Sequence, residues 1–154
     1  MSMLDIIHDF YGHSLERAIA VAVDAHANQV DKQGRPYILH VLRVMMAGTT
    51  DEERIVGVLH DLLEDTEYKA VDLLHLGFSP ECVEAIVDLT HTKWQSNHEY
   101  YAQVKENPLA LAVKRYDIDD NYNRLGEVVD LATRQRLKDK YDRARKVLFG
   151  EGNE

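Results

Sequence analysis

Residues 58–67 read VLHDLLEDTE, which places one histidine and several acidic side chains in a segment whose apolar residues recur at helical spacing. His60 and Glu64 are four residues apart, as are Asp61 and Asp65, so these four groups occupy two adjacent rows of one predicted helix. His60 and Asp61 can then ligate one cation together, while Glu64 and Asp65 stand one turn further along. Taken alone, the stretch is better explained as the solvated face of an amphipathic helix.

The segments on both sides of this stretch repeat the helical spacing, which predicts an all-α bundle of about seven or eight helices. We find no alternation of strands with helices and no repeat of fixed period. At 154 residues, we expect a single domain over residues 1–154, with a core from about 14 to 148. The predicted helices cover about residues 14–26, 37–47, 51–64, 70–76, 79–90, 98–105, 109–122 and 133–148.

Composition excludes several classes of partner. The net charge is −9, and the basic residues that gather after Arg134 are interrupted by acidic ones, so we expect no nucleic acid to bind. No apolar run approaches the ~20 residues that cross a bilayer, and no secretory signal is visible, so we expect no membrane partner. The single cysteine, Cys82, fits a cytoplasmic location. A homo-oligomer is possible, since the sequence does not determine the oligomeric state.

Two further polar clusters lie in or directly behind apolar segments. His40 stands in PYILHVLRV, where a lone histidine is more often a satisfied core residue than a ligand. Asp120 and Asn121 stand three and four residues after Asp117 in VKRYDIDDNYNR, which places the three on one face of a helix. A charged helix surface also explains this second cluster.

A calcium-binding loop is another alternative for the second cluster. Asp117, Asp119 and Asn121 match the first three ligand positions of an EF-hand. The sixth position, which requires glycine, is Tyr122, and the twelfth, which requires glutamate, is Val128. The sequence therefore excludes an EF-hand.

The combination of the clusters favours a shared site. His40, the pair His60-Asp61, and Asp117 occur in this order on three successive long helical segments, which is much harder to obtain by chance than any one piece. The runs AHANQVDKQGRPYILHVLRV, VLHDLLEDTE and NPLALAVKRYDIDDN resemble the HD-domain metal-dependent phosphohydrolases. The resemblance is strongest to the small alarmone hydrolases and to the (p)ppGpp hydrolase domain of the Rel/SpoT stringent-response enzymes, and it covers about residues 15–141.

This resemblance implies a metal site and a catalytic acid pair. The metal is typically Mn²⁺, and Fe²⁺ and Zn²⁺ also suit two imidazoles with two carboxylates. Glu64 and Asp65 match the pair that orients and activates the attacking water. His8 and Asp9 repeat the His-Asp dipeptide but match nothing in the pattern, so we interpret them as structural. The implied metal ligands are His40, His60, Asp61 and Asp117.

The same resemblance implies residues that bind a small-molecule nucleotide substrate. Lys32 matches a lysine that approaches the phosphates, and Asn121 matches an asparagine that closes the nucleotide pocket. Tyr37 and Lys114 are expected near the pocket. Because the chain is acidic overall, an anionic substrate must be attracted by local positive charge, which a metal and Lys32 would supply.

The implied activity is that of a guanosine-3′,5′-bis(diphosphate) 3′-pyrophosphohydrolase, and too few residues remain for a synthetase module, so a stand-alone hydrolase is expected. Asp31 stands where many alarmone hydrolases have an arginine that can stack on guanine, and Arg115 and Tyr116 also depart from the usual pattern. Two alternatives follow. One is an HD-type nucleotide phosphatase or nucleotidase with a different substrate, and the other is a non-catalytic nucleotide-binding HD domain.

Overall fold

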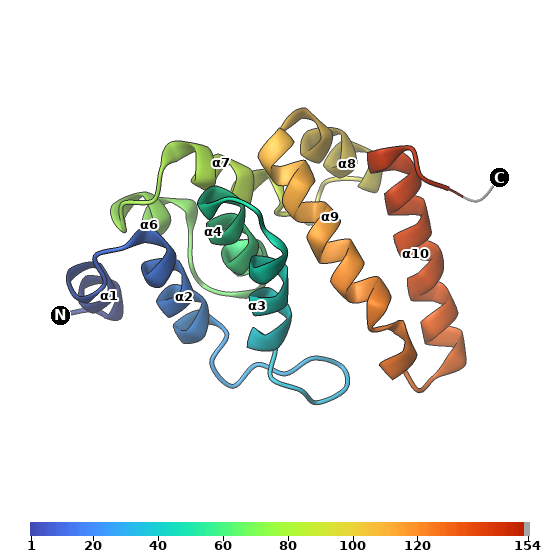
Figure 1. Cartoon of the computed structure of the whole chain (residues 1–154), viewed down its shortest axis with the longest axis horizontal. Coiled ribbons are helices and arrows are strands. Elements are labelled where there is room, and N and C mark those ends of the chain that lie inside the picture. Colours follow the sequence, from blue (N-terminus) through green and yellow to red (C-terminus); the bar gives the residue numbers. More distant parts are fainter. Residues whose placement is uncertain (153–154) are drawn as a thin grey trace.

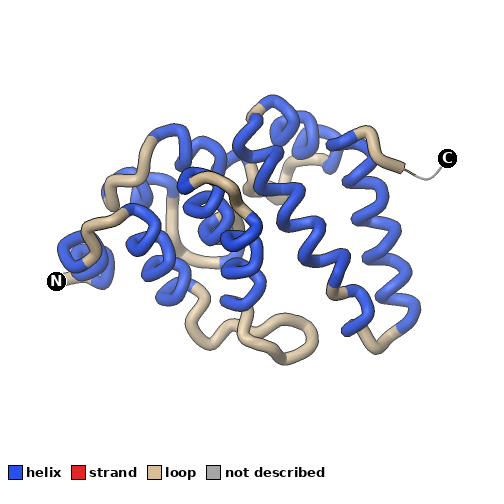
Figure 2. The backbone as a smooth tube through the Cα atoms, viewed as in Figure 1, coloured by secondary structure: helices blue, strands red, loops and turns tan. Residues whose placement is uncertain are grey.

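The computed structural model describes residues 1–152 as a bundle of helices joined by loops, with α1 at one end and α10 at the other (Figures 1 and 2). Over these residues, extended backbone pairs at one isolated bridge, between Val30 and Pro36. The all-α prediction is confirmed; residues 153 and 154 of the predicted domain lie outside the described part. The elements are α1 (Met3–Phe10), α2 (Ser14–Ala25), α3 (Ile38–Ala47), α4 (Asp51–Leu59), α5 (Leu62–Asp65), α6 (Ala70–His75), α7 (Pro80–Asp88), α8 (Asn97–Glu106), α9 (Pro108–Asn123), the 3₁₀ turn η1 (Leu125–Glu127) and α10 (Leu131–Phe149).

Helix α4 forms the centre of the fold. Its last five residues, 55–59, are all buried, and the helix packs against α2, α3, α7 and α9. A helix that is apolar on every side must be covered on every side. In Figure 1, α1, α2 and α6 lie on one side of α4, and α8, α9 and α10 lie on the other. Anything attached to the end of α4 is therefore held deep in the molecule.

Side-chain caps and prolines set the starts of several helices. The Thr50 side chain accepts a hydrogen bond from the N–H of Glu53 before α4. Ser79 and Asn107 likewise cap α7 and α9, each of which has a proline in its first turn. These local signals explain why the predicted bounds agree with the structure to within two residues, apart from the helix predicted over 51–64. Among residues 1–152, no helix combines the length and the apolar character that crossing a membrane requires.

Helix α1 was not predicted from the sequence. It is only eight residues long, little more than two turns, and buries only Ile7, so its sequence holds too few helical repeats to stand out. A reciprocal cap between Ser2 and Asp5 fixes its start. His8 and Asp9, the second His-Asp dipeptide, lie exposed on this helix and contact each other at 3.0 Å. Their place in α1 is consistent with a structural role.

Gly57 allows α4 to approach α3 closely. A Cβ atom at this position would lie 3.2 Å from both the Cα and the backbone N of Met45. These are backbone atoms within α3, which cannot move aside as a flexible side chain can. The close packing of the two helices therefore requires glycine at position 57.

We expect Gly57→Val to destabilise the protein, because the added methyl groups must push α4 away from α3. Overpacking of this kind costs about 1–3 kcal/mol, which lowers the Tm of a chain of this size by about 2–10 °C. Differential scanning calorimetry measures the effect. The matched control is Gly12→Val, since a Cβ at residue 12 meets nothing within 4 Å. Equal Tm values for the two variants would contradict the packing argument.

Candidate functional site

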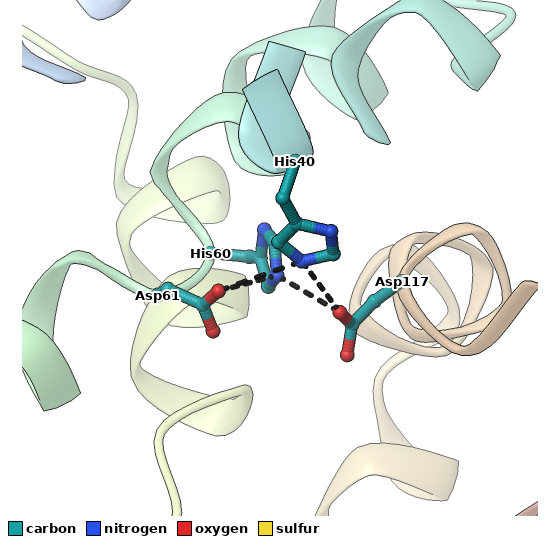
Figure 3. A group of neighbouring side chains, drawn as sticks. All are labelled: His40, His60, Asp61 and Asp117. Atoms are coloured by element: carbon teal, nitrogen blue, oxygen red, sulfur yellow. Dashed lines mark hydrogen bonds and ion pairs between the residues drawn. The ribbon is translucent and has the colours of Figure 1, made fainter. Parts of the chain in front are cut away.

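Three helical segments bring the four predicted metal ligands together at the end of α4. His40 comes from the first turn of α3, His60 and Asp61 from the junction of α4 and α5, and Asp117 from the middle of α9. Each residue offers one ligand atom, and these atoms all lie within 4.8 Å of one another. Figure 3 shows the four side chains pointing toward a common centre.

The spacing of the donor atoms fits a single divalent cation. Nε2 of His60 lies 3.1 Å from Oδ2 of Asp61 and 3.3 Å from Oδ1 of Asp117. Nε2 of His40 lies 3.0 Å from the same Asp117 oxygen and 3.7 Å from Oδ2 of Asp61. Neighbouring ligands around an octahedral cation with bonds of about 2.1 Å are about 3 Å apart. Two imidazole nitrogens and two carboxylate oxygens are also a suitable donor set for Mn²⁺, Fe²⁺ or Zn²⁺.

The site interrupts the helix that the sequence predicted over residues 51–64. In a continuous helix the carbonyl of Gly57 would accept the N–H of Asp61. Here it accepts the Nδ1–H of His60 at 2.6 Å, and α4 ends at Leu59. Asp61 has φ −96° and ψ 0°, in a sparsely populated region where many active-site residues occur. The prediction of one helix with two polar rows is therefore wrong, because a side chain competes for a backbone acceptor.

A second hydrogen bond orients each histidine. His40 donates its Nδ1–H to Oδ2 of Asp120 at 2.7 Å, which directs Nε2 toward the other ligands. Arg43 in turn donates to Oδ1 of Asp120 at 2.6 Å. His60 uses the neutral Gly57 carbonyl for the same purpose, so the two imidazoles have partners of different charge. Both kinds of partner fix the orientation of the imidazole ring and raise its basicity as a ligand.

The local charges keep the carboxylates of the two predicted ligands, Asp61 and Asp117, ionised. Burial opposes ionisation of Asp61, but the neighbouring His60 outweighs it and lowers the pKa of Asp61 to about 2. Burial likewise opposes ionisation of Asp117, but Lys114, with Nζ 3.0 Å from Oδ2, and the two histidines hold its pKa well below the ordinary value. Lys114, predicted near the pocket, therefore contacts a ligand carboxylate directly.

A cavity of about 350 Å³ opens beside the ligands, within the size range of small-molecule sites. His40 lines it, together with three of the predicted substrate residues, Lys32, Tyr37 and Asn121. Tyr37 also donates its hydroxyl to Oδ2 of Asp61, and Asn121 donates to Oδ1 of Asp117 at 3.1 Å. The cavity wall and the ligand cluster therefore share hydrogen bonds.

The predicted catalytic pair divides between two environments. Asp65 lines the cavity beside His40, and its burial and the charge of Asp61 raise the pKa of its carboxyl. Glu64 accepts the backbone N–H of His91, from the loop between α7 and α8. Burial raises the pKa of Glu64 as well, against the effect of that N–H. The structure thus distinguishes two acids that the sequence treats as equivalent.

Two residues with clear roles in this arrangement were not predicted. Asp120 orients His40, and Arg124 lines the cavity. A weak signal existed for both, since Asp120 stands three residues after Asp117 and Arg124 four residues after Asp120, on one face of α9 and its end. That spacing says nothing about which residues of other helices they meet.

The chain is similar in sequence to known hydrolases, although the similarity covers only part of each. No protein-family model matches the chain. The chain is 29% identical over 126 residues, 75% of its length, to the guanosine-3′,5′-bis(diphosphate) 3′-pyrophosphohydrolase of Aquifex aeolicus (strain VF5). It is 33% identical over 96 residues, 58% of its length, to the protein of the same name from Vibrio cholerae serotype O1. The chain covers 18% and 14% of these two relatives, so it corresponds to a small part of each.

A solved structure, described as a metazoan ortholog of SpoT that hydrolyzes ppGpp, shares the fold. The TM-score is 0.71, the sequence identity is 24%, and the match covers 90% of this chain and 85% of the other. These similarities confirm the resemblance to an HD-type (p)ppGpp hydrolase domain that the three sequence runs indicated, together with its all-helical fold.

Proposed function

We propose that the chain is a metal-dependent phosphohydrolase that removes the 3′-diphosphate from guanosine-3′,5′-bis(diphosphate) or a closely related nucleotide. One observation carries this proposal: the cluster of four ligand atoms includes His40, which lines a cavity whose wall also holds an acid of raised pKa, Asp65, and a cation, Lys32. Such a site provides for binding an anionic group and for removing a proton beside it. The names of the curated relatives support the choice of substrate.

In this proposal His40, His60, Asp61 and Asp117 hold Mn²⁺, with Fe²⁺ and Zn²⁺ as alternatives. When bound, the cation supplies Lewis acidity toward water and toward a phosphoryl oxygen. The choice of Mn²⁺ rests on the resemblance, because the donor set suits all three metals.

The chain's own residues would move the proton and hold the substrate. Asp65 accepts a proton from the attacking water, and a pKa raised toward neutrality makes it a better base. Glu64 orients the same water with the carboxylate oxygen that does not accept the N–H of His91. Lys32 and Asn121 hold the phosphates and the nucleotide in the cavity, and Tyr37 and Lys114 keep the two ligand carboxylates in place.

We also propose a cytoplasmic location and a small-molecule partner, with no nucleic acid or membrane bound. Cys82 is a buried free thiol, as suits a reducing compartment. The net charge of −9 disfavours a polyanionic partner, whereas a single nucleotide needs only the local charge at the site.

We expect Asp65→Asn to lower kcat by about 100- to 10,000-fold, because it removes the proposed general base, while Mn²⁺ affinity stays unchanged. Ion-exchange chromatography measures pyrophosphate release from guanosine-3′,5′-bis(diphosphate), with nucleoside monophosphates as competing substrates. Asp9→Asn is the control, since Asp9 is an exposed acid on α1. Faster hydrolysis of monophosphates would refute the proposed substrate, and full activity of Asp61→Ala would refute the site itself.

We expect Asp120→Asn to weaken Mn²⁺ binding by about 10- to 100-fold, as is typical when the partner of a ligating histidine is altered. Isothermal titration calorimetry of the purified protein with MnCl₂ measures this without any turnover. Asp119→Asn is the matched control, because Asp119 is adjacent in sequence and pairs with Arg145 instead of a ligand. If both variants bind Mn²⁺ equally, Asp120 does not position His40.

A further inference from the structure

Arg124 is fixed in the wall of the cavity by carboxylates that approach all three of its guanidinium nitrogens. Nη2 lies 2.5 Å from Oδ2 of Asp31, and Nε lies 3.3 Å from Oε2 of Glu127. Nη1 lies 3.8 Å from Oδ2 of Asp120. The N–H groups of a guanidinium lie in its plane, so these partners engage its edges. The hydrogen bonds to Asp31 and Glu127 therefore fix the orientation of the guanidinium and leave its flat face uncovered by these carboxylates.

Asp31 serves as the anchor for this arginine. Its Oδ1 accepts the backbone N–H groups of Gln33 at 2.9 Å and Arg35 at 3.0 Å, while its Oδ2 pairs with Arg124. The carboxylate is therefore engaged on both oxygens and its charge is balanced within the protein. Asp31 therefore does not make this part of the cavity wall repel an anionic ligand, because Arg124, 93 residues away in the sequence, pairs with it.

The surroundings of Arg124 suit a planar ring better than a phosphate. Leu125 and Val128, from the turn that follows Arg124, line the same cavity, and so does Tyr141 of α10. Apolar and aromatic side chains beside a planar guanidinium suit a nucleobase, which is a flat ring that can stack on the guanidinium and pack against apolar groups. Lys32, whose ammonium is a compact point charge, supplies the in-cavity charge that phosphate requires.

We propose that Arg124, held edge-on by Asp31 and Glu127, is a specificity-determining residue that stacks its guanidinium face on the base of the nucleotide substrate. This inference rests on the proposed function and deepens it, because it makes the base part of what the site recognises. The protein would then distinguish a nucleotide from a base-free diphosphate by contact with Arg124.

The test compares a ligand that has a base with one that lacks it. Guanosine-3′,5′-bis(diphosphate) and inorganic pyrophosphate are titrated calorimetrically with Mn²⁺ present, in an Asp65→Asn background that suppresses turnover. Arg124→Lys keeps the charge and removes the plane, so we expect nucleotide affinity to fall about tenfold and pyrophosphate affinity to stay the same. Arg35→Lys is the matched control, since Arg35 pairs with the same Glu127 and is more than half exposed.

The other outcomes separate the possible failures. An equal loss for both ligands would overturn the inference by making Arg124 a phosphate-binding residue, and no loss for either would overturn it as well. Parent protein that binds neither ligand would instead refute the proposed function on which the inference rests. If Arg124→Lys fails to fold, Asp31→Asn gives the same test: it releases the anchor, and we expect weaker nucleotide binding with pyrophosphate binding unchanged.

Discussion

Two histidines and two aspartates meet at the buried end of the central helix, and the rest of the structure is arranged so that they can coexist there. His60 is 2% exposed, His40 4% and Asp117 7%. Ionisable groups removed from water are costly unless each has a partner. The partners here include the Gly57 carbonyl, Asp120 and Lys114, and a bound cation would add a further one.

This requirement explains several local features that otherwise look unrelated. The break after α4 exists because His60 takes a backbone carbonyl that the helix would use. Gly57 must be small because the same turn lies against α3, which carries His40. Tyr37 and Asn121 line the cavity and also donate to Asp61 and Asp117, so the shape of the cavity depends on the ligand carboxylates. The packing of α4 against α3 and the positions of the predicted metal ligands therefore depend on the same turn, the one between α4 and α5.

Charge is organised locally in a protein that is acidic overall. With a net charge of −9, the surface as a whole does not attract an anion. The cavity has Lys32 and Arg124 in its wall, and Asp31 is neutralised by its pairing with Arg124. The two cations differ in kind: a compact ammonium suits phosphate, and a planar guanidinium oriented by carboxylates at its edges suits a flat ring. Under the proposed function, such a division would let one small cavity recognise both halves of a nucleotide.

The sequence by itself determined the helical class, most helix bounds and the residues that resemble a metal-ligand set. Helix periods and caps act over a few residues, and the ordered runs containing His40, His60-Asp61 and Asp117 identify the resemblance whatever the packing. Only the tertiary structure decided the break at residue 60, the separate surroundings of Glu64 and Asp65, and the partners of Asp120 and Arg124. These depend on contacts between segments up to 93 residues apart, which local propensity does not encode.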